Sequence, residues 1–213
     1  MATPNKILMQ QARESLRGKW GLAVGTYLLY SLIVGGASNL PYIGAHASLI
    51  IGGPMMLGMV MFSLALSRHH RARLKHLFKG FQRFWMALGT YMLMMLFVFL
   101  WMLLLIVPGI IAALSYSMTF YIQADDKTMG PFDALEKSKK MMYGYKWKYF
   151  CLQWRFFGWA MLSILTLGVG FLWLVPYIQV SKAKFYDDIK ESVQTELKTE
   201  ELVEAALTNT EGV

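Results

Sequence analysis

Charged residues are missing from three long stretches of this chain. Only 16% of its 213 residues are charged and 56% are hydrophobic, whereas soluble domains are about 25% charged. No Asp, Glu, Lys or Arg occurs in 20–67 or in 84–123, and Arg155 alone interrupts 149–181. A spanning helix needs about 20 apolar residues, so each stretch is long enough for roughly two crossings. The sequence therefore predicts a polytopic membrane protein and excludes an ordinary soluble domain.

Cysteine is almost absent as well, because Cys151 is the only one, and this excludes an intramolecular disulfide. Helix breakers lie near the middle of each apolar stretch: Gly35, Gly36, Asn39, Pro41, Pro108, Gly109, Gly168 and Gly170. Proline removes a backbone donor and glycine relaxes the helix, so these positions predict turns. We therefore predict an all-α fold with six transmembrane helices in three helical hairpins. The predicted spans are 20–36, 48–67, 86–106, 109–124, 149–166 and 170–185.

Lys and Arg are absent from the three predicted hairpin tips and cluster between the hairpins. The basic segments are the N-terminus, 68–83, 127–148 and the end of the sixth span at Lys182 and Lys184. Cytoplasmic segments of membrane proteins carry such an excess, and six spans place all of these segments on one side. We therefore expect a multi-pass membrane protein with both termini in the cytoplasm.

A short phrase, Gly-Thr-Tyr, occurs at 25–27 and again at 89–91. Each copy follows a tryptophan, and a third tryptophan precedes the last hairpin; the three are Trp20, Trp85 and Trp147. An amphipathic segment precedes each tryptophan, at 4–17, 72–83 and 131–143. Tryptophan prefers the headgroup level, so each unit consists of a cytoplasmic amphipathic helix followed by a hairpin. All units run in the same direction, which predicts a parallel internal repeat, with hairpins at 20–67, 86–124 and 149–186.

Several segments together resemble one family of bacterial integral membrane proteins. They are RGKWGLAVGTYLLYSLI, LFKGFQRFWMALGTYMLMMLF, LLLIVPGIIAALSYSMTFYI, ALEKSKKMMYGYKWKYF and LTLGVGFLWLVPYIQVSKAKFYDDI. These segments resemble the DUF975 family over about residues 5–190. The resemblance implies a multi-spanning helical protein of the bacterial cytoplasmic (inner) membrane and no established activity. The hairpins are also similar to the membrane domain attached to some glycerophosphodiester phosphodiesterases, but no phosphodiesterase domain is present. Arg155 departs from the family pattern, which suggests a small polar residue there.

Catalytic motifs are missing from the sequence. It contains no H-E-x-x-H, C-x-x-C, G-x-S-x-G or Walker-type glycine loop, and the apolar stretches hold no acid. His69, His70 and His76 lie in an arginine-rich loop without a nearby carboxylate or thiol, which disfavours a metal site. We therefore expect no enzyme, no cofactor and no metal, and we interpret these histidines as solvated loop residues.

Seven basic residues are the candidate lipid-facing or partner-facing site: Arg68, Arg71, Arg73, Lys75, Lys79, Arg83 and Arg155. The first six belong to the amphipathic segment between the first two hairpins. We expect them to face anionic lipid of the inner leaflet, in preference to a nucleic acid or an acidic partner. Arg155 lies about seven residues past Lys148, or roughly 10 Å into the fifth span. We expect the Arg155 side chain to snorkel to the headgroups or to pair with Asp125 or Asp126, in preference to a transport role.

The remaining features separate a membrane domain, 1–186, from an acidic cytoplasmic tail, 187–213. The acidic composition of the tail predicts either a solvated helix or a disordered segment. Methionines concentrated in the second and third spans suggest adaptable apolar packing, with a lipid or peptide groove as the alternative.

The leading hypothesis is a non-catalytic scaffold or accessory module that binds lipid, a protein partner or a second copy of itself. The alternative is a transporter or permease for a small hydrophobic or amphiphilic molecule.

Overall fold

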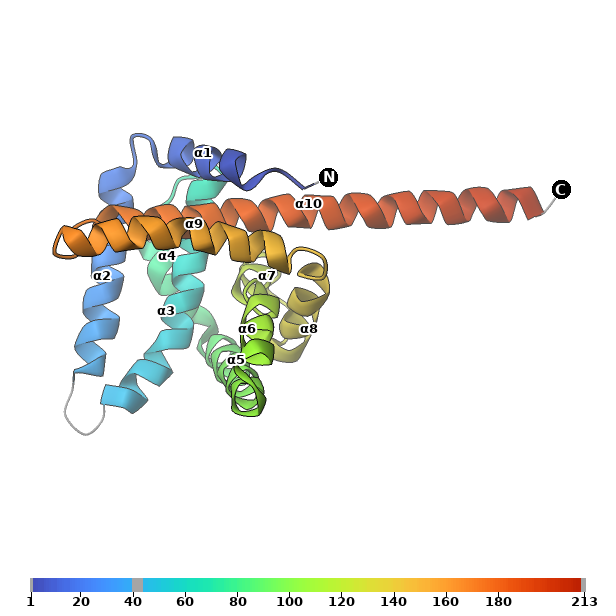
Figure 1. Cartoon of the computed structure of the whole chain (residues 1–213). Coiled ribbons are helices and arrows are strands. Elements are labelled where there is room, and N and C mark those ends of the chain that lie inside the picture. The colour runs from blue at the N-terminus through green and yellow to red at the C-terminus, as the bar shows by residue number, and fades with distance from the viewer. Residues whose placement is uncertain (1, 40–43, 212–213) are drawn as a thin grey trace.

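The computed structural model describes residues 2–39 and 44–211, and its regular structure within these residues is entirely helical (Figure 1). The predicted all-α class is therefore confirmed. The helices in chain order are α1 (Asn5–Leu16), α2 (Trp20–Ser38), α3 (Gly44–Ser67), α4 (Lys75–Phe78), the 3₁₀ helix η1 (Lys79–Arg83), α5 (Phe84–Leu104), α6 (Ile106–Ser115), α7 (Thr119–Asp125), α8 (Pro131–Met141), α9 (Lys146–Leu165) and α10 (Phe171–Glu211). Pro41, one of the predicted turn residues, lies outside the described residues.

Four helical segments of the described chain are long and apolar enough to cross a membrane. They are Trp20–Ser38, His46–Ser67, Lys75–Leu104 and Ile106–Asp125. The third predicted pair, α9 and the first part of α10, is also helical. Neither helix is among the four candidate membrane spans. α9 carries Lys146, Lys148 and Arg155, which lower its mean hydropathy. The structure thus supports four candidate spans.

The helices of each predicted pair are neighbours, but the pairs cross one another. α2 packs against α3, α5 against α6, and α9 against α10. Figure 1 shows α9 and α10 running across α2 and α3, with the last part of α10 extending away from all other helices. The crossings bring the ends of α3 and α7 close to the middle of α10, and this meeting point organises the site described below.

The fourth predicted span, 109–124, is broken into α6 and α7 between Ser115 and Thr119. Such a break exposes backbone groups that need partners. The fully buried hydroxyl of Ser138 on α8 provides them: it donates to the Ser115 carbonyl at 2.8 Å and accepts from the Met118 amide at 3.2 Å. α8 therefore stabilises the break from outside the apolar stretch.

The segment 72–83, predicted as one amphipathic helix on the cytoplasmic surface, differs from that prediction. It forms the short α4 and η1, and both pack tightly against α3. A Cβ atom added at Gly58 would collide with the Leu77 carbonyl, and one added at Gly80 would collide with the Pro54 carbonyl. The backbones of α3 and of the α4–η1 segment are in direct contact at these glycines. The segment 72–83 is therefore packed into the fold. The other two amphipathic segments form α1 and α8 close to the predicted bounds.

The predicted boundary between the membrane domain and the acidic tail is not a break in the structure. α10 is one helix of 41 residues that continues through position 187 to Glu211. Of the two predicted alternatives for the tail, the helix is the one observed.

Candidate functional site: an inner ion cluster and an apolar pocket

Arg68, the first residue after α3, is the centre of an ion cluster. Its Nη1 lies 2.7 Å from Asp125 Oδ1, and its Nη2 lies 2.6 Å from Asp187 Oδ1. Lys190 Nζ contacts the other oxygen of Asp125 at 2.6 Å, and the Tyr186 hydroxyl donates to that oxygen at 3.2 Å. The cluster thus joins the ends of α3 and α7 to the middle of α10.

A second group of contacts lies beside this cluster. Lys148 Nζ at the start of α9 lies 2.7 Å from Asp188 Oδ2, and the Thr3 amide donates to Asp188 Oδ1 at 2.9 Å. The Asn5 side chain donates to the Lys148 carbonyl at 2.8 Å. These bonds hold the N-terminal segment and the start of α9 on α10.

Two groups of the ion cluster keep their usual protonation states near neutral pH. The hydrogen bond to Asp125 raises the pKa of Arg68 further above its usual value, although burial opposes this. Burial, and then the charge of Asp125, raise the pKa of Tyr186 well above its usual value. Arg68 therefore stays charged and Tyr186 stays a hydrogen-bond donor in the contacts that join these helices.

The six basic residues predicted as one lipid-facing site are divided by the structure. Arg68 is occupied by the ion cluster. Arg83 is half-buried: its Nη1 donates to the Gln123 carbonyl at 2.9 Å, while its buried Nη2 has no hydrogen-bond partner. Of the remaining residues, Lys79 is half-buried, and Arg71, Arg73 and Lys75 are exposed to solvent.

Arg155 lies apart from all of these residues. It is exposed on α9, and no ion pair involving it occurs in the described part of the chain. The two acids considered as its partners have other contacts, since Asp125 binds Arg68 and Lys190, and Asp126 accepts from the Thr128 hydroxyl at 2.7 Å. Its exposure fits a snorkelling side chain better than a buried pair.

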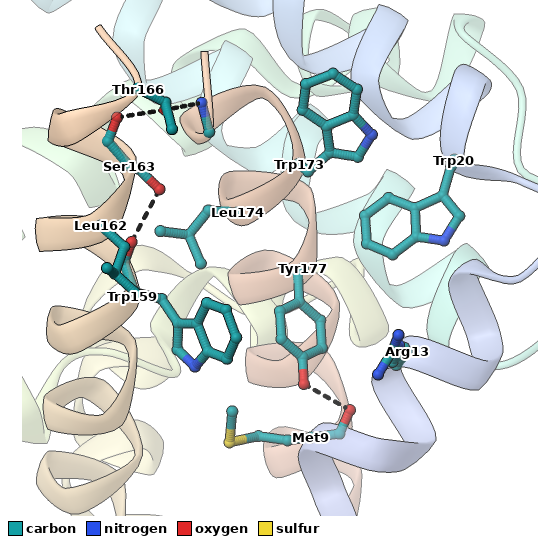
Figure 2. A pocket seen from close by; sticks show the side chains of 11 residues that line it. Met9, Arg13, Trp20, Trp159, Leu162, Ser163, Thr166, Trp173, Leu174 and Tyr177 are labelled. Atoms are coloured by element: carbon teal, nitrogen blue, oxygen red, sulfur yellow. Dashed lines mark hydrogen bonds between the residues drawn. The ribbon is translucent and has the colours of Figure 1, made fainter. Parts of the chain in front are cut away.

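An apolar pocket of about 470 Å³ lies between α1 and α2 on one side and α9 and α10 on the other (Figure 2). Pockets that bind small molecules usually measure about 300–1,000 Å³. Its walls are mainly aromatic and aliphatic: Met9, Trp20, Trp159, Leu162, Trp173, Leu174 and Tyr177. Three indoles therefore face one space, although their residues are far apart in the sequence.

The hydroxyl groups of this pocket are already bonded within the chain. The Tyr177 hydroxyl donates to the Met9 carbonyl at 3.1 Å, and the hydroxyls of Ser163 and Thr166 donate to carbonyls of α9 (Figure 2). Arg13 is different, because its exposed guanidinium lines the pocket without a hydrogen bond or ion pair in the described part of the chain. The pocket therefore combines apolar walls with one available cation.

Sequence reasoning did not find this site. Arg13 contributed only to the count of basic residues at the N-terminus, and Trp20 and Trp173 are 153 positions apart. The available signal was the placement of Arg13 on an amphipathic helix just before an interfacial tryptophan. Nothing in the sequence showed that α9 and α10 would lie beside that helix.

The fold and these sites define an all-helical protein with four helices that are compatible with a membrane. A profile of the DUF975 family, described as proteins of unknown function, matches residues 1–115 and 102–193. The chain belongs to this family. No curated protein and no solved structure matches it.

Proposed function

We propose that this chain is a non-catalytic integral membrane protein that binds anionic phospholipid from the cytoplasmic leaflet, in the pocket between α1, α2, α9 and α10. The observation that carries the proposal is the position of Arg13, an available cation beside an apolar pocket with three indoles. A phosphate group at Arg13 would gain a charge-assisted hydrogen bond, while an acyl chain would cover the aromatic walls.

The topology that we propose has the four candidate spans, with both termini in the cytoplasm of a bacterial cell. α9 and α10 then lie at the inner face, because Thr166 and Gly170 at the tip between them line the same pocket as Arg13 and Trp20. The basic segments 68–83 and 127–148 support this topology, because the positive-inside pattern places both in the cytoplasm. The ion cluster supports it further: Arg68 follows the second span and Asp125 ends the fourth, and there Arg68 binds Asp187 and Asp125 binds Lys190 of α10.

The exposed residues Arg71, Arg73 and Lys75 add to this lipid-binding surface. Each basic residue near an anionic membrane contributes about 1 kcal/mol of attraction. We propose that these three residues attract the inner leaflet in general, whereas Arg13 holds one lipid molecule. No contact with a nucleic acid is proposed.

The test compares lipid retention by three forms of the full chain: wild type, Arg13→Gln and Arg17→Gln. Arg17 is a matched control, because it is an exposed arginine directly after α1 that does not line the pocket. Each form is titrated with phosphatidylglycerol and with phosphatidylcholine in detergent, and bound lipid is counted by native mass spectrometry.

We expect one tightly held phosphatidylglycerol in wild type and in Arg17→Gln, with weaker binding of phosphatidylcholine. Arg13→Gln should weaken phosphatidylglycerol binding about tenfold or more, since a hydrogen bond to a charged group contributes about 1.5–3 kcal/mol. Equal retention by Arg13→Gln and Arg17→Gln would overturn the assignment of the pocket.

A further inference from the structure

A second pocket, which we call the central chamber, lies where all three helix pairs meet. It measures about 510 Å³ and is lined by residues of α2, α3, α5, α6, α7, α9 and α10. The segments that precede each pair pack on the helices that line it: α4 and η1 pack on α3, α8 packs on α5 and α7, and α1 packs on α10. The chamber opens to the surface at Met95, Phe99 and Met102, which are exposed, and it is separate from the pocket of Figure 2.

Methionines give the chamber an adaptable apolar wall. Met56 and Met59 of α3 face the same space as Met94, Met95 and Met102 of α5. Unbranched thioether side chains adjust to flexible ligands and are common at binding surfaces of broad specificity. The sequence offered packing and a lipid or peptide groove as alternatives for these methionines, and the structure brings five of them into one pocket.

Six polar side chains that line the chamber have no hydrogen-bond partner in the described part of the chain: Tyr30, Tyr91, Tyr121, Tyr149, Gln179 and Lys182. Tyr121 is only 3% exposed, and its buried hydroxyl is unsatisfied. Gln179 and Lys182 lie on neighbouring turns of α10. An unsatisfied buried hydroxyl is costly, and native structures normally pair such groups. A ligand that accepts hydrogen bonds would satisfy Tyr121, Gln179 and Lys182.

The nearby carboxylates do not neutralise Lys182. Asp125 binds Arg68 and Lys190, and Asp187 binds Arg68. Lys182 is thus the available cation of the chamber, as Arg13 is of the other pocket. One ammonium among uncharged donors matches a head group with a single negative charge, whereas a doubly charged phosphate monoester would require more cations.

We infer that the central chamber binds a single-chain amphiphile with a carboxylate head, that is, a long-chain fatty acid. The carboxylate contacts Lys182, Tyr121 and Gln179, and the alkyl chain lies along the methionines of α3 and α5. This site goes beyond the proposed phospholipid pocket, shares no lining residue with it, and holds a ligand of a different chemical class.

The experiment measures tritiated hexadecanoic acid on the purified full chain in maltoside micelles by scintillation proximity. Unlabelled hexadecanoic acid and hexadecanol compete for the site, which separates recognition of the carboxylate from burial of the chain. The variants are Lys182→Gln and Tyr121→Phe. Their matched controls, Lys198→Gln and Tyr143→Phe, change exposed residues outside the chamber.

We expect hexadecanoic acid to compete at least tenfold better than hexadecanol. Lys182→Gln should weaken binding about tenfold or more, Tyr121→Phe should weaken it severalfold, and both controls should bind like wild type. A folded Val98→Trp variant, which fills the chamber, should lose binding of the acid altogether.

Equal competition by acid and alcohol, or equal affinity of Lys182→Gln and Lys198→Gln, would overturn the inference. A folded Val98→Trp variant that still binds the acid would place it elsewhere and would also overturn it. The two proposals fail separately: Arg13→Gln should leave binding of hexadecanoic acid unchanged, and Lys182→Gln should leave retention of phosphatidylglycerol unchanged.

Discussion

Ser138 shows at the scale of one residue how the fold tolerates a break in an apolar stretch. Its hydroxyl bonds both sides of the gap between α6 and α7, so no alternative partner is needed there. We predict that Ser138→Ala lowers the free energy of unfolding by about 1–3 kcal/mol, because it leaves buried backbone groups unpaired. Thermal unfolding of the purified protein measures this, with the exposed Thr199→Ala as the control. Equal melting temperatures would show that the hydroxyl does not stabilise the break.

Arg68 makes the corresponding connection between helices through charge. Arg68→Gln removes a cation shared by Asp125 and Asp187, and we predict a loss of about 1–3 kcal/mol of stability. The matched change Arg71→Gln, at an exposed position three residues away, should alter stability by less than about 0.5 kcal/mol. Denaturant titration of both variants measures the difference. If both lose the same stability, the cluster does not hold the three helices together.

At the scale of the element, the contact between α3 and the α4–η1 segment depends on glycine. We predict that Gly58→Ala and Gly80→Ala each destabilise the protein by about 1–3 kcal/mol or more, because the added methyl group meets a backbone carbonyl. Gly21→Ala on α2 is the control, since nothing lies within 4 Å of its added Cβ. Fluorescence-detected size exclusion after heating measures the folded fraction. A folded fraction of both variants equal to that of Gly21→Ala would contradict the close approach of these backbones.

The elements were largely predictable from the sequence because their signals are local. Long apolar stretches predicted the helices that became α2, α3, α5 and α9, and the amphipathic pattern of 131–143 predicted α8. The segment 72–83 was predicted less well. Its charges indicated a surface helix, but the contact of Gly80 with Pro54 depends on α3 and has no signal within the segment.

The sites were less predictable for the same physical reason. Arg68 looked equivalent to Arg71 and Arg73, because the acids that bind it are 57 and 119 positions away. Arg13 and Lys182 looked like ordinary cytoplasmic charges, and only tertiary packing places each beside an apolar pocket. Pairing between distant residues therefore decided which cations are occupied and which remain available.

At the scale of the whole molecule, the four-span topology makes a direct prediction about the tip between α9 and α10. Leu167 at this tip is 97% exposed. In a chain carrying Cys151→Ser, we predict that Leu167→Cys reacts with a membrane-impermeant maleimide only after the cells are permeabilised. Arg71→Cys, in a cytoplasmic segment, should behave in the same way. If Leu167→Cys reacts in intact cells, α9 and α10 cross the membrane, and the protein has six spans.

The most direct test of the central claim, that this protein binds lipid without catalysis, is native mass spectrometry of the wild-type chain after gentle purification. The account predicts a discrete complex that retains one anionic phospholipid, with a fatty acid as a separate, second adduct. A chain that carries only bulk lipid in the proportions of the membrane, or a stoichiometric protein companion in place of lipid, would contradict it.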